Sequence, residues 1–134
     1  MGLTLAPHPP DTSLRDAAMR AAEIAGRWAA EVDRDARFPH EALGALRETR
    51  LLGALIPVSL GGLGSAFHEV ADACEILGTQ CANTAMVFAM HQIEVHLLTR
   101  HARDAAAFHP ILLDIAERQL LLASAMSSLS LIHI

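Results

Sequence analysis

Apolar residues recur every three or four positions from Leu14 to Val32, and this spacing constrains the fold more than any other feature. The apolar set is Leu14, Ala17, Ala18, Ala21, Ile24, Ala25, Trp28, Ala29 and Val32. These positions lie on one side of an α-helix, and the charged residues of the segment mostly lie off it. Thr12 or Ser13 can cap the N-terminus of such a helix. The pattern predicts a long amphipathic helix that must bury one face.

The composition extends this prediction to most of the chain. Hydrophobic residues make up 52% of the 134, mostly Ala and Leu, with no Tyr and one Trp. This bias favours helices over β-sheet. Further helices are predicted from Pro39, over residues 66–77 with Ser65 as the N-cap and Gly78 as the stop, over about 80–99, and over about 110–117.

The pattern changes near the C-terminal end. The run "QLLLASAMSS", residues 119–128, is apolar without helical capping and predicts a buried strand. A single strand cannot pair alone, so we expect the sequence to be cut short where a sheet begins. The predicted fold is all-α, a helical bundle with one orphan strand at the C-terminal end. The expected divisions are a flexible segment over 1–12, a helical domain over 13–118, the start of a β domain over 119–128, and a non-native or truncated tail over 129–134.

Charge and cysteine usage exclude several classes of function. The net charge is −5 and no basic run occurs, which argues against a nucleic-acid surface. Cys74 and Cys81 form neither a CxxC pair nor a disulfide framework, as expected in a reducing cytoplasm. The least charged stretch, residues 76–93, contains too many polar residues to span a membrane. We therefore expect a soluble, cytoplasmic protein.

The stretch "IPVSLGGLGSAF", residues 56–67, holds three glycines in four positions. Their spacing does not match the G-x-G-x-x-G pattern of a dinucleotide-binding loop, and a Walker loop is excluded because the chain lacks lysine. Glycines also allow the positive φ angles of a tight reversal. This segment is therefore predicted to be a turn between helices.

Several motifs in register resemble one family. "RFPHEALGALRETRLLGALIPVSLGGLG" is followed by a helix, then by "CEILGTQCANTAMVFAMH" and "LLLASAMSS". Together they resemble the N-terminal helical domain of the acyl-CoA dehydrogenase family and the first strand of its middle domain. Arg50 stands where this family often has Gly, and a left-handed backbone there costs about 1 kcal/mol relative to Gly.

The resemblance implies an FAD-dependent oxidoreductase of fatty acid metabolism that removes two hydrogens from the α and β carbons of an acyl thioester. In this family the carboxylate base lies in the C-terminal domain, and FAD lies between the middle and C-terminal domains. No catalytic residue is therefore expected in this chain, which alone should be inactive. The implied partners are acyl-CoA or another acyl thioester, the missing middle and C-terminal domains, an electron acceptor and further copies in a homo-oligomer.

The resemblance also implies which residues line the site. The helix over 80–99 is expected to lie along the acyl chain near the flavin. Asn83, Val87 and His91 recur at i, i+4 and i+8, which predicts that they share one stripe of the helix, with Met86 and Met90 flanking it. Methionine suits a flexible alkyl chain, although the same spacing is also typical of core residues.

Two residues are candidate flavin contacts. His91 either contacts flavin or substrate, or is a core histidine with satisfied hydrogen bonds. Some flavin monooxygenases on this scaffold use a histidine near the flavin. Ser127 matches the family's Thr, whose hydroxyl bonds the flavin ring, and Ser keeps that hydroxyl.

Other chemistries find little support in the sequence. The chain has eight histidines, but Glu69, Glu75 and Glu94 are not followed by His three residues later, as a di-iron bundle requires. No G-x-S-x-G elbow occurs, and neither cysteine has a basic partner at fixed spacing. No metal site is expected. Three hypotheses remain: part of an acyl-CoA dehydrogenase, part of a flavin monooxygenase on the same scaffold, or a non-catalytic helical interaction module.

Overall fold

The structure, a computed structural model, describes residues 13–101 and 107–123. The elements in these ranges are α1 (Leu14–Arg34), α2 (His40–Glu48), the 3-10 helices η1 (Leu51–Gly53) and η2 (Val58–Leu60), α3 (Phe67–Gln80), α4 (Ala82–His101) and α5 (His109–Arg118). The all-α prediction is confirmed, and the described ranges contain no strand. None of their helices is long and apolar enough to cross a membrane.

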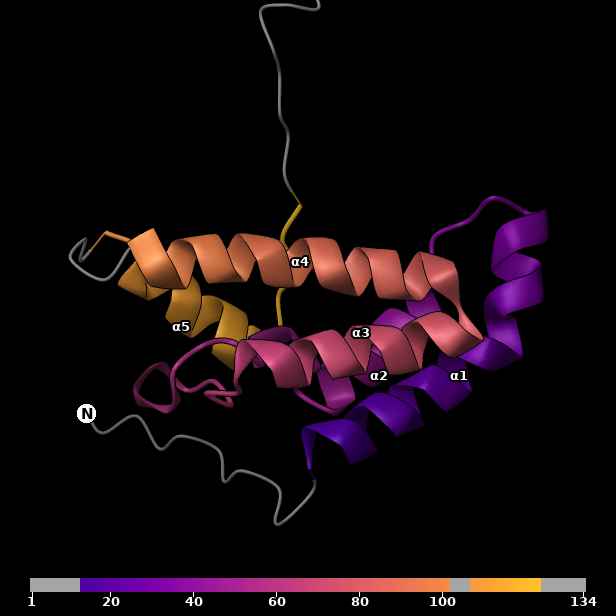
Figure 1. The fold of residues 1–134 in the computed structure, drawn as a ribbon. Coiled ribbons are helices and arrows are strands. Elements are labelled where there is room, and N and C mark those ends of the chain that lie inside the picture. The colour runs from indigo at the N-terminus through magenta and orange to yellow at the C-terminus, as the bar shows by residue number, and fades with distance from the viewer. Residues whose placement is uncertain (1–12, 102–106, 124–134) are drawn as a thin grey trace, which may run out of the picture.

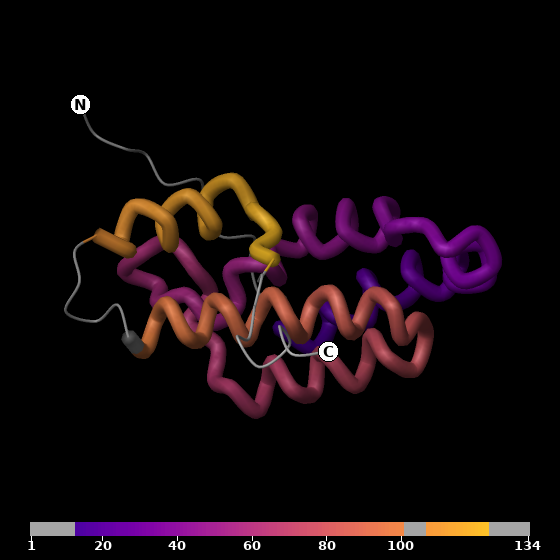
Figure 2. Tube along the Cα trace, turned by 90° about the horizontal axis from the view of Figure 1, so that it is seen from above, coloured from indigo at the N-terminus to yellow at the C-terminus, as the bar shows by residue number. Residues whose placement is uncertain are grey.

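The helices pack in a sequence-local order (Figure 1). Helix α1 packs against α2 and α3, and α3 packs against α4. Viewed from above, α4 runs between α3 on one side and α5 on the other (Figure 2). A single residue, Cys81, in extended backbone, joins α3 to α4 and makes the two helices an antiparallel hairpin.

Helix α1 forms as its sequence predicts. Ser13 is the N-cap, and its Oγ accepts a hydrogen bond from the backbone N–H of Asp16 at 3.1 Å. The buried face consists largely of alanines, which let α3 approach closely. Trp28 departs from the predicted pattern. It is partly exposed, and the guanidinium of Arg37 lies 5.7 Å from the centre of its ring.

The predicted ends of α3 need correction. The N-cap is Ala66 rather than Ser65, because the Oε2 of Glu69 reaches back to accept a hydrogen bond from the N–H of Ala66 at 2.7 Å. Gly78 is not the stop, since the helix continues to Gln80. It faces Ala85 of α4 instead, at a distance where a methyl group would make an ordinary van der Waals contact.

The glycine segment is a tight reversal that links η2 to α3. Gly61 and Gly64 adopt positive φ angles of 80° and 64°. Gly62 packs so closely on Ile56 that a methyl group there would overlap the Ile56 carbonyl oxygen. The turn prediction is confirmed.

Arg50, which stands where the family that the motifs resemble often has Gly, adopts the left-handed conformation, with φ 58°. Its Nη2 donates hydrogen bonds to the carbonyl oxygens of Gly61 and Ala116, both at 3.1 Å. The side chain therefore joins the end of α2, the glycine turn and the last turn of α5. These bonds offset the backbone strain.

Residues 119–123, the described part of the predicted strand, form no strand. Gln119 reverses the chain after α5 with φ 50°, and the residues that follow have no strand neighbour in the described ranges to pair with. Leu120 and Leu122 pack against the cluster of Ile56, Val95, Leu112, Ile115 and Ala116, whereas Leu121 packs against the larger cluster at the centre of the bundle. The remainder of the predicted strand, the segment 1–12 and the tail 129–134 lie outside the described residues.

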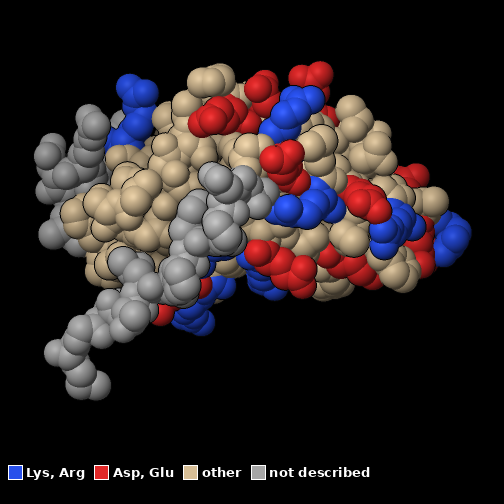
Figure 3. Space-filling view, turned by 90° about the horizontal axis from the view of Figure 1, so that it is seen from below, with Lys and Arg blue, Asp and Glu red and all other residues tan. Residues whose placement is uncertain are grey.

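Charged side chains are spread without a single-sign patch on the face seen from below. Figure 3 shows acidic and basic side chains interspersed over the side of this face where α1 lies. The ion pairs of the described residues include one between Arg37 and Glu31, with a nearest distance of 2.8 Å. Mixed charge of this kind is typical of an ordinary solvated surface.

Candidate functional site

Helix α4 has a buried inward face and, opposite it, an exposed apolar face. The inward face is buried and consists of Thr84, Phe88, His91, Gln92 and Val95. The outward face is a stripe of large apolar side chains at spacings of four, three and four residues: Met86 is 63% exposed, Met90 41%, Ile93 47% and Leu97 46%. We call these four residues the α4 stripe. Large apolar side chains that are exposed next to one another are typical of a contact surface, so the α4 stripe is the best candidate contact surface in the described chain.

The structure brings together only some of the residues predicted to line the site. Met86 and Met90 lie on the α4 stripe, and Asn83 is exposed at the start of the same helix. Val87 is half-buried and His91 is fully buried. Four residues advance a helix by about 400°, so each i+4 step turns about 40° further from the starting face. For this reason Asn83, Val87 and His91 do not share one face.

His91 is a core histidine whose two ring nitrogens are both bonded to the backbone. Its Nε2 lies 2.8 Å from the carbonyl oxygen of Leu52, and its Nδ1 accepts a hydrogen bond from the N–H of Leu122 at 3.0 Å. The ring has no exposed surface. Burial lowers the pKa of His91 below its ordinary value, although the bond to Leu52 opposes this shift. The ring of His91 therefore has no free nitrogen for the predicted contact with flavin or substrate. The geometry fits the alternative, a core histidine with satisfied hydrogen bonds.

The second predicted flavin contact, Ser127, lies outside the described residues. Ile93 and Leu97 are site candidates that the sequence analysis missed. The alternation of steps of four and three from Met86 would have identified them, because it follows one helix face more closely than repeated steps of four.

The glycine turn is not a phosphate-binding loop. The backbone N–H groups of Gly61, Gly62, Leu63 and Gly64 donate to the carbonyl oxygens of Val58, Pro57, Gly53 and Ile56, at 2.8–3.2 Å. A phosphate cradle needs N–H groups that are free to point at the ligand. Here they hold the turn together.

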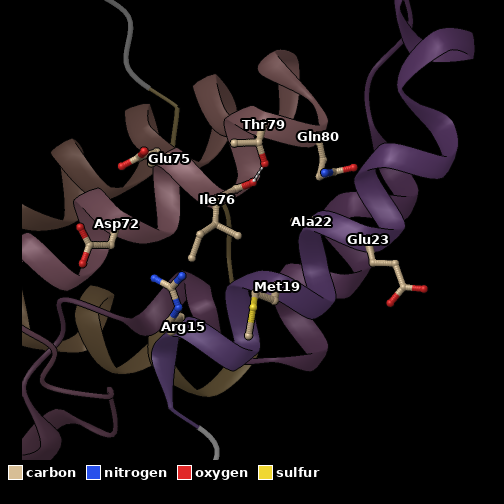
Figure 4. Close-up of a pocket in the computed structure, with 9 residues that line it drawn as sticks. All are labelled: Arg15, Met19, Ala22, Glu23, Asp72, Glu75, Ile76, Thr79 and Gln80. Carbon is tan, nitrogen blue, oxygen red and sulfur yellow. Dashed lines mark hydrogen bonds between the residues drawn. The ribbon is translucent and has the colours of Figure 1, made fainter.

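Two open clefts lie beside α1. The first, about 580 Å³, lies between α1 and α3 (Figure 4). Figure 4 shows Ile76 extending from α3 toward α1, with Arg15 rising from α1 and the acidic side chains of Asp72 and Glu75 further along α3. The second cleft, about 480 Å³, lies between α1 and α2. Neither cleft includes a residue of the α4 stripe.

Within residues 13–101 and 107–123, no three His, Cys, Asp or Glu side chains come close enough together to hold a metal ion. Cys81 is buried, and burial raises the pKa of the half-buried Cys74 thiol. A raised pKa disfavours the thiolate, which is the nucleophilic form. Neither cysteine is therefore suited to nucleophilic chemistry.

Comparison with known protein families assigns the chain to one of them. Residues 10–107 match the family described as "Acyl-CoA dehydrogenase, N-terminal domain". The chain belongs to the acyl-CoA dehydrogenase family. This match confirms the resemblance and covers α1 to α4, including the α4 stripe.

One curated relative in this acyl-CoA dehydrogenase family is 3-sulfinopropanoyl-CoA desulfinase from Paraburkholderia xenovorans (strain LB400). It is 33% identical over 75 residues, which are 55% of this chain and 19% of the relative. The chain thus aligns with only about a fifth of that protein's length. No solved structure shows a significant match.

Proposed function

We propose that this chain is part of a flavin-dependent enzyme that dehydrogenates an acyl-CoA thioester between its α and β carbons. In this proposal α4 supplies a wall of the pocket that holds the acyl chain beside the flavin. The family match supports the enzyme class. The name of the relative denotes a CoA thioester, which supports CoA as the carrier.

The observation on which the proposal mainly depends is the α4 stripe. Burying a side chain of this size contributes roughly 1.5–3 kcal/mol, and a residue that is half exposed forgoes about half of that. Four such residues in a row therefore favour a further layer over the outer face of α4. That layer would be the acyl chain together with other parts of the complete protein.

The chemistry of the stripe suits an alkyl group. Met86 and Met90 have unbranched, polarizable side chains that adapt to irregular apolar shapes. Ile93 and Leu97 continue the same apolar surface toward the end of α4. A wall of this kind excludes water and thereby strengthens the hydrogen bonds that activate the thioester carbonyl.

The described residues fit FAD only as apolar neighbours. His91 has no free ring nitrogen. The α4 stripe offers van der Waals contact but no hydrogen bond. Bound FAD would accept the hydride from the β carbon. The described residues are proposed to shape the pocket and to exclude water from it. Ser127 is proposed in addition as the hydrogen-bond donor to the flavin ring.

The two alternatives are weaker. The monooxygenase hypothesis depended on a histidine facing the flavin, and His91 is instead bonded to Leu52 and Leu122. A non-catalytic helical interaction module would present the same apolar stripe to a partner protein, and the family match is what favours an enzyme over it. We also propose cytoplasmic localisation, a homo-oligomeric complete protein and a separate electron acceptor, in line with the family.

The test uses the product of the longest open reading frame that contains this sequence. We expect a yellow protein. Under anaerobic conditions its flavin absorbance should decrease when a saturated acyl-CoA is added, and the product should be a 2-enoyl-CoA. A protein without flavin, or a flavin that no acyl-CoA reduces, would contradict the proposal. Adding 3-sulfinopropanoyl-CoA distinguishes dehydrogenation from the desulfinase activity that the relative's name denotes. Loss of the sulfinate group without a net decrease in flavin absorbance would indicate desulfination.

A matched pair of variants tests the role of α4. Met90→Glu places a charge on the stripe and should raise the KM for a long-chain acyl-CoA at least tenfold, because a carboxylate beside an alkyl chain is costly to desolvate. Met19→Glu changes a methionine of similar exposure on α1, away from the stripe, and should leave the KM within about twofold. Equal effects of the two variants would contradict the assignment of α4 as the pocket wall.

A further inference from the structure

Three separate segments meet around Leu52, which is fully buried in η1. The backbone N–H of Leu52 donates to the side-chain Oε1 of Gln119 at 3.2 Å. Its carbonyl oxygen lies 2.8 Å from Nε2 of His91. Both backbone polar groups of Leu52 are thus satisfied by side chains from distant parts of the sequence.

The segment that follows α5 closes this arrangement into a ring. Leu122, three residues after Gln119, donates its backbone N–H to Nδ1 of His91 at 3.0 Å. Gln119 is fixed by a second bond, from its Nε2 to the carbonyl oxygen of Ala116 at 2.8 Å. Its own carbonyl oxygen accepts a hydrogen bond from Nε of Arg47 at 3.2 Å. The chain after α5 is therefore held at two points, Gln119 and Leu122.

The partners of His91 determine its protonation. A backbone carbonyl can only accept, so Nε2 must have the proton. A backbone N–H can only donate, so Nδ1 must present its lone pair. Only the neutral Nε2–H form satisfies both bonds.

We infer that His91 is a positioning residue that fixes the path by which the chain leaves the helical layer after α5. Leu120 and Leu122 pack against one apolar cluster and Leu121 against another, but apolar contacts alone would let the segment slide along its own direction. The bond from Leu122 to His91 removes that freedom, because it sets one backbone atom at one place on α4. The proposed function adds that this path aims the chain toward the flavin site, although the ring of hydrogen bonds exists without it.

Two amide substitutions separate the two bonds of His91. The amide group of Asn lies near the position of the His Nδ1 atom, so His91→Asn can still accept from Leu122 but does not reach Leu52. The amide group of Gln lies near the position of Nε2, so His91→Gln can still donate to Leu52 but does not accept from Leu122. Hydrogen exchange at the amide of Leu122 is then measured in the 134-residue chain by NMR.

We expect His91→Gln to accelerate exchange at Leu122 by about tenfold relative to wild type, the effect of losing one buried hydrogen bond. His91→Asn should keep the rate within about threefold. The control Val32→Ala removes buried methyl groups from α1, outside the cluster on which Leu122 packs, and should accelerate exchange throughout the helices rather than at Leu122 in particular. An unchanged rate in His91→Gln, or equal acceleration in both His91 variants, would overturn the inference.

The wild-type protein gives a second test that needs no variant. At neutral pH the imidazole nitrogens of His91 should show a single neutral form, protonated at Nε2 and unprotonated at Nδ1. A mixture of tautomers, or a proton on Nδ1, would overturn the inference. These results do not depend on flavin or acyl-CoA, so they can fail while the proposed function stands, and the reverse.

Discussion

Arg50 allows backbone strain to be separated from the hydrogen bonds that offset it. The residue combines a left-handed backbone, φ 58°, with a half-buried guanidinium that bonds Gly61 and Ala116 at 3.1 Å. Arg50→Ala removes the bonds but keeps the strain. One charged donor nitrogen serving two carbonyls contributes about 2 kcal/mol, so the free energy of unfolding should fall by about that amount.

Arg50→Gly removes the same bonds but also relieves the strain, which is about 1 kcal/mol. It should therefore unfold about 1 kcal/mol more easily than wild type and be about 1 kcal/mol more stable than Arg50→Ala. Urea unfolding followed by circular dichroism measures all three proteins. Arg27→Ala is the control, since Arg27 forms only an exposed ion pair with Glu23, and its effect should stay below about 0.5 kcal/mol. A glycine variant more stable than wild type would show that the hydrogen bonds contribute less than the strain costs. Equal stability of the Ala and Gly variants would refute the strain itself.

Three further outcomes are expected. Gly62→Ala should lower the free energy of unfolding by about 3 kcal/mol in the same urea assay, because its methyl group overlaps the backbone of Ile56, and a wild-type midpoint would contradict that packing. The free energy of unfolding should fall as pH decreases below 6.5, because burial lowers the pKa of His91 and only the unfolded chain takes up a proton there near pH 6.5. A loss of stability of the same size in His91→Gln would rule out His91 as the source. The 134-residue chain should bind no FAD and should associate at high concentration through its exposed apolar stripe, so a yellow preparation, or a sharp monomer in gel filtration, would count against the account.

Much of the fold could be predicted from local chemistry. The spacing of alanines and other apolar residues defined α1, and Thr12 or Ser13 marked its start, which the structure has at Ser13. Both signals act within a few residues of the chain. The conformation of Arg50 followed from a family pattern that often has Gly at that position. These features required no knowledge of distant contacts.

The prediction errors arise where contacts between residues far apart in the sequence determine the local structure. Gly78 resembles a helix stop in sequence, but it lies inside α3 opposite Ala85. An apolar run such as residues 119–128 predicts a strand, yet Leu120 and Leu122 pack on helices in the described structure, where no neighbouring strand is available. Sequence spacing alone contains neither relationship.

The candidate site shows the same limit. Sequence identified Met86 and Met90 on α4 but could not decide the role of His91, since a histidine beside apolar residues fits both a ligand contact and the core. The decision depends on Leu52, 39 positions earlier, and Leu122, 31 positions later. The partners of such a buried polar group become visible only in the folded chain.

The central claim is that the outer face of α4 is covered in the complete enzyme, by acyl chain and neighbouring domains. Methionine oxidation by dilute peroxide, followed by mass spectrometry, tests it most directly. In the 134-residue chain Met86, Met90 and Met19 are all exposed and should oxidise at similar rates. In the product of the longest reading frame, with acyl-CoA bound, we predict that Met86 and Met90 become protected at least tenfold while Met19 does not. Unchanged oxidation of Met86 and Met90 would contradict the claim.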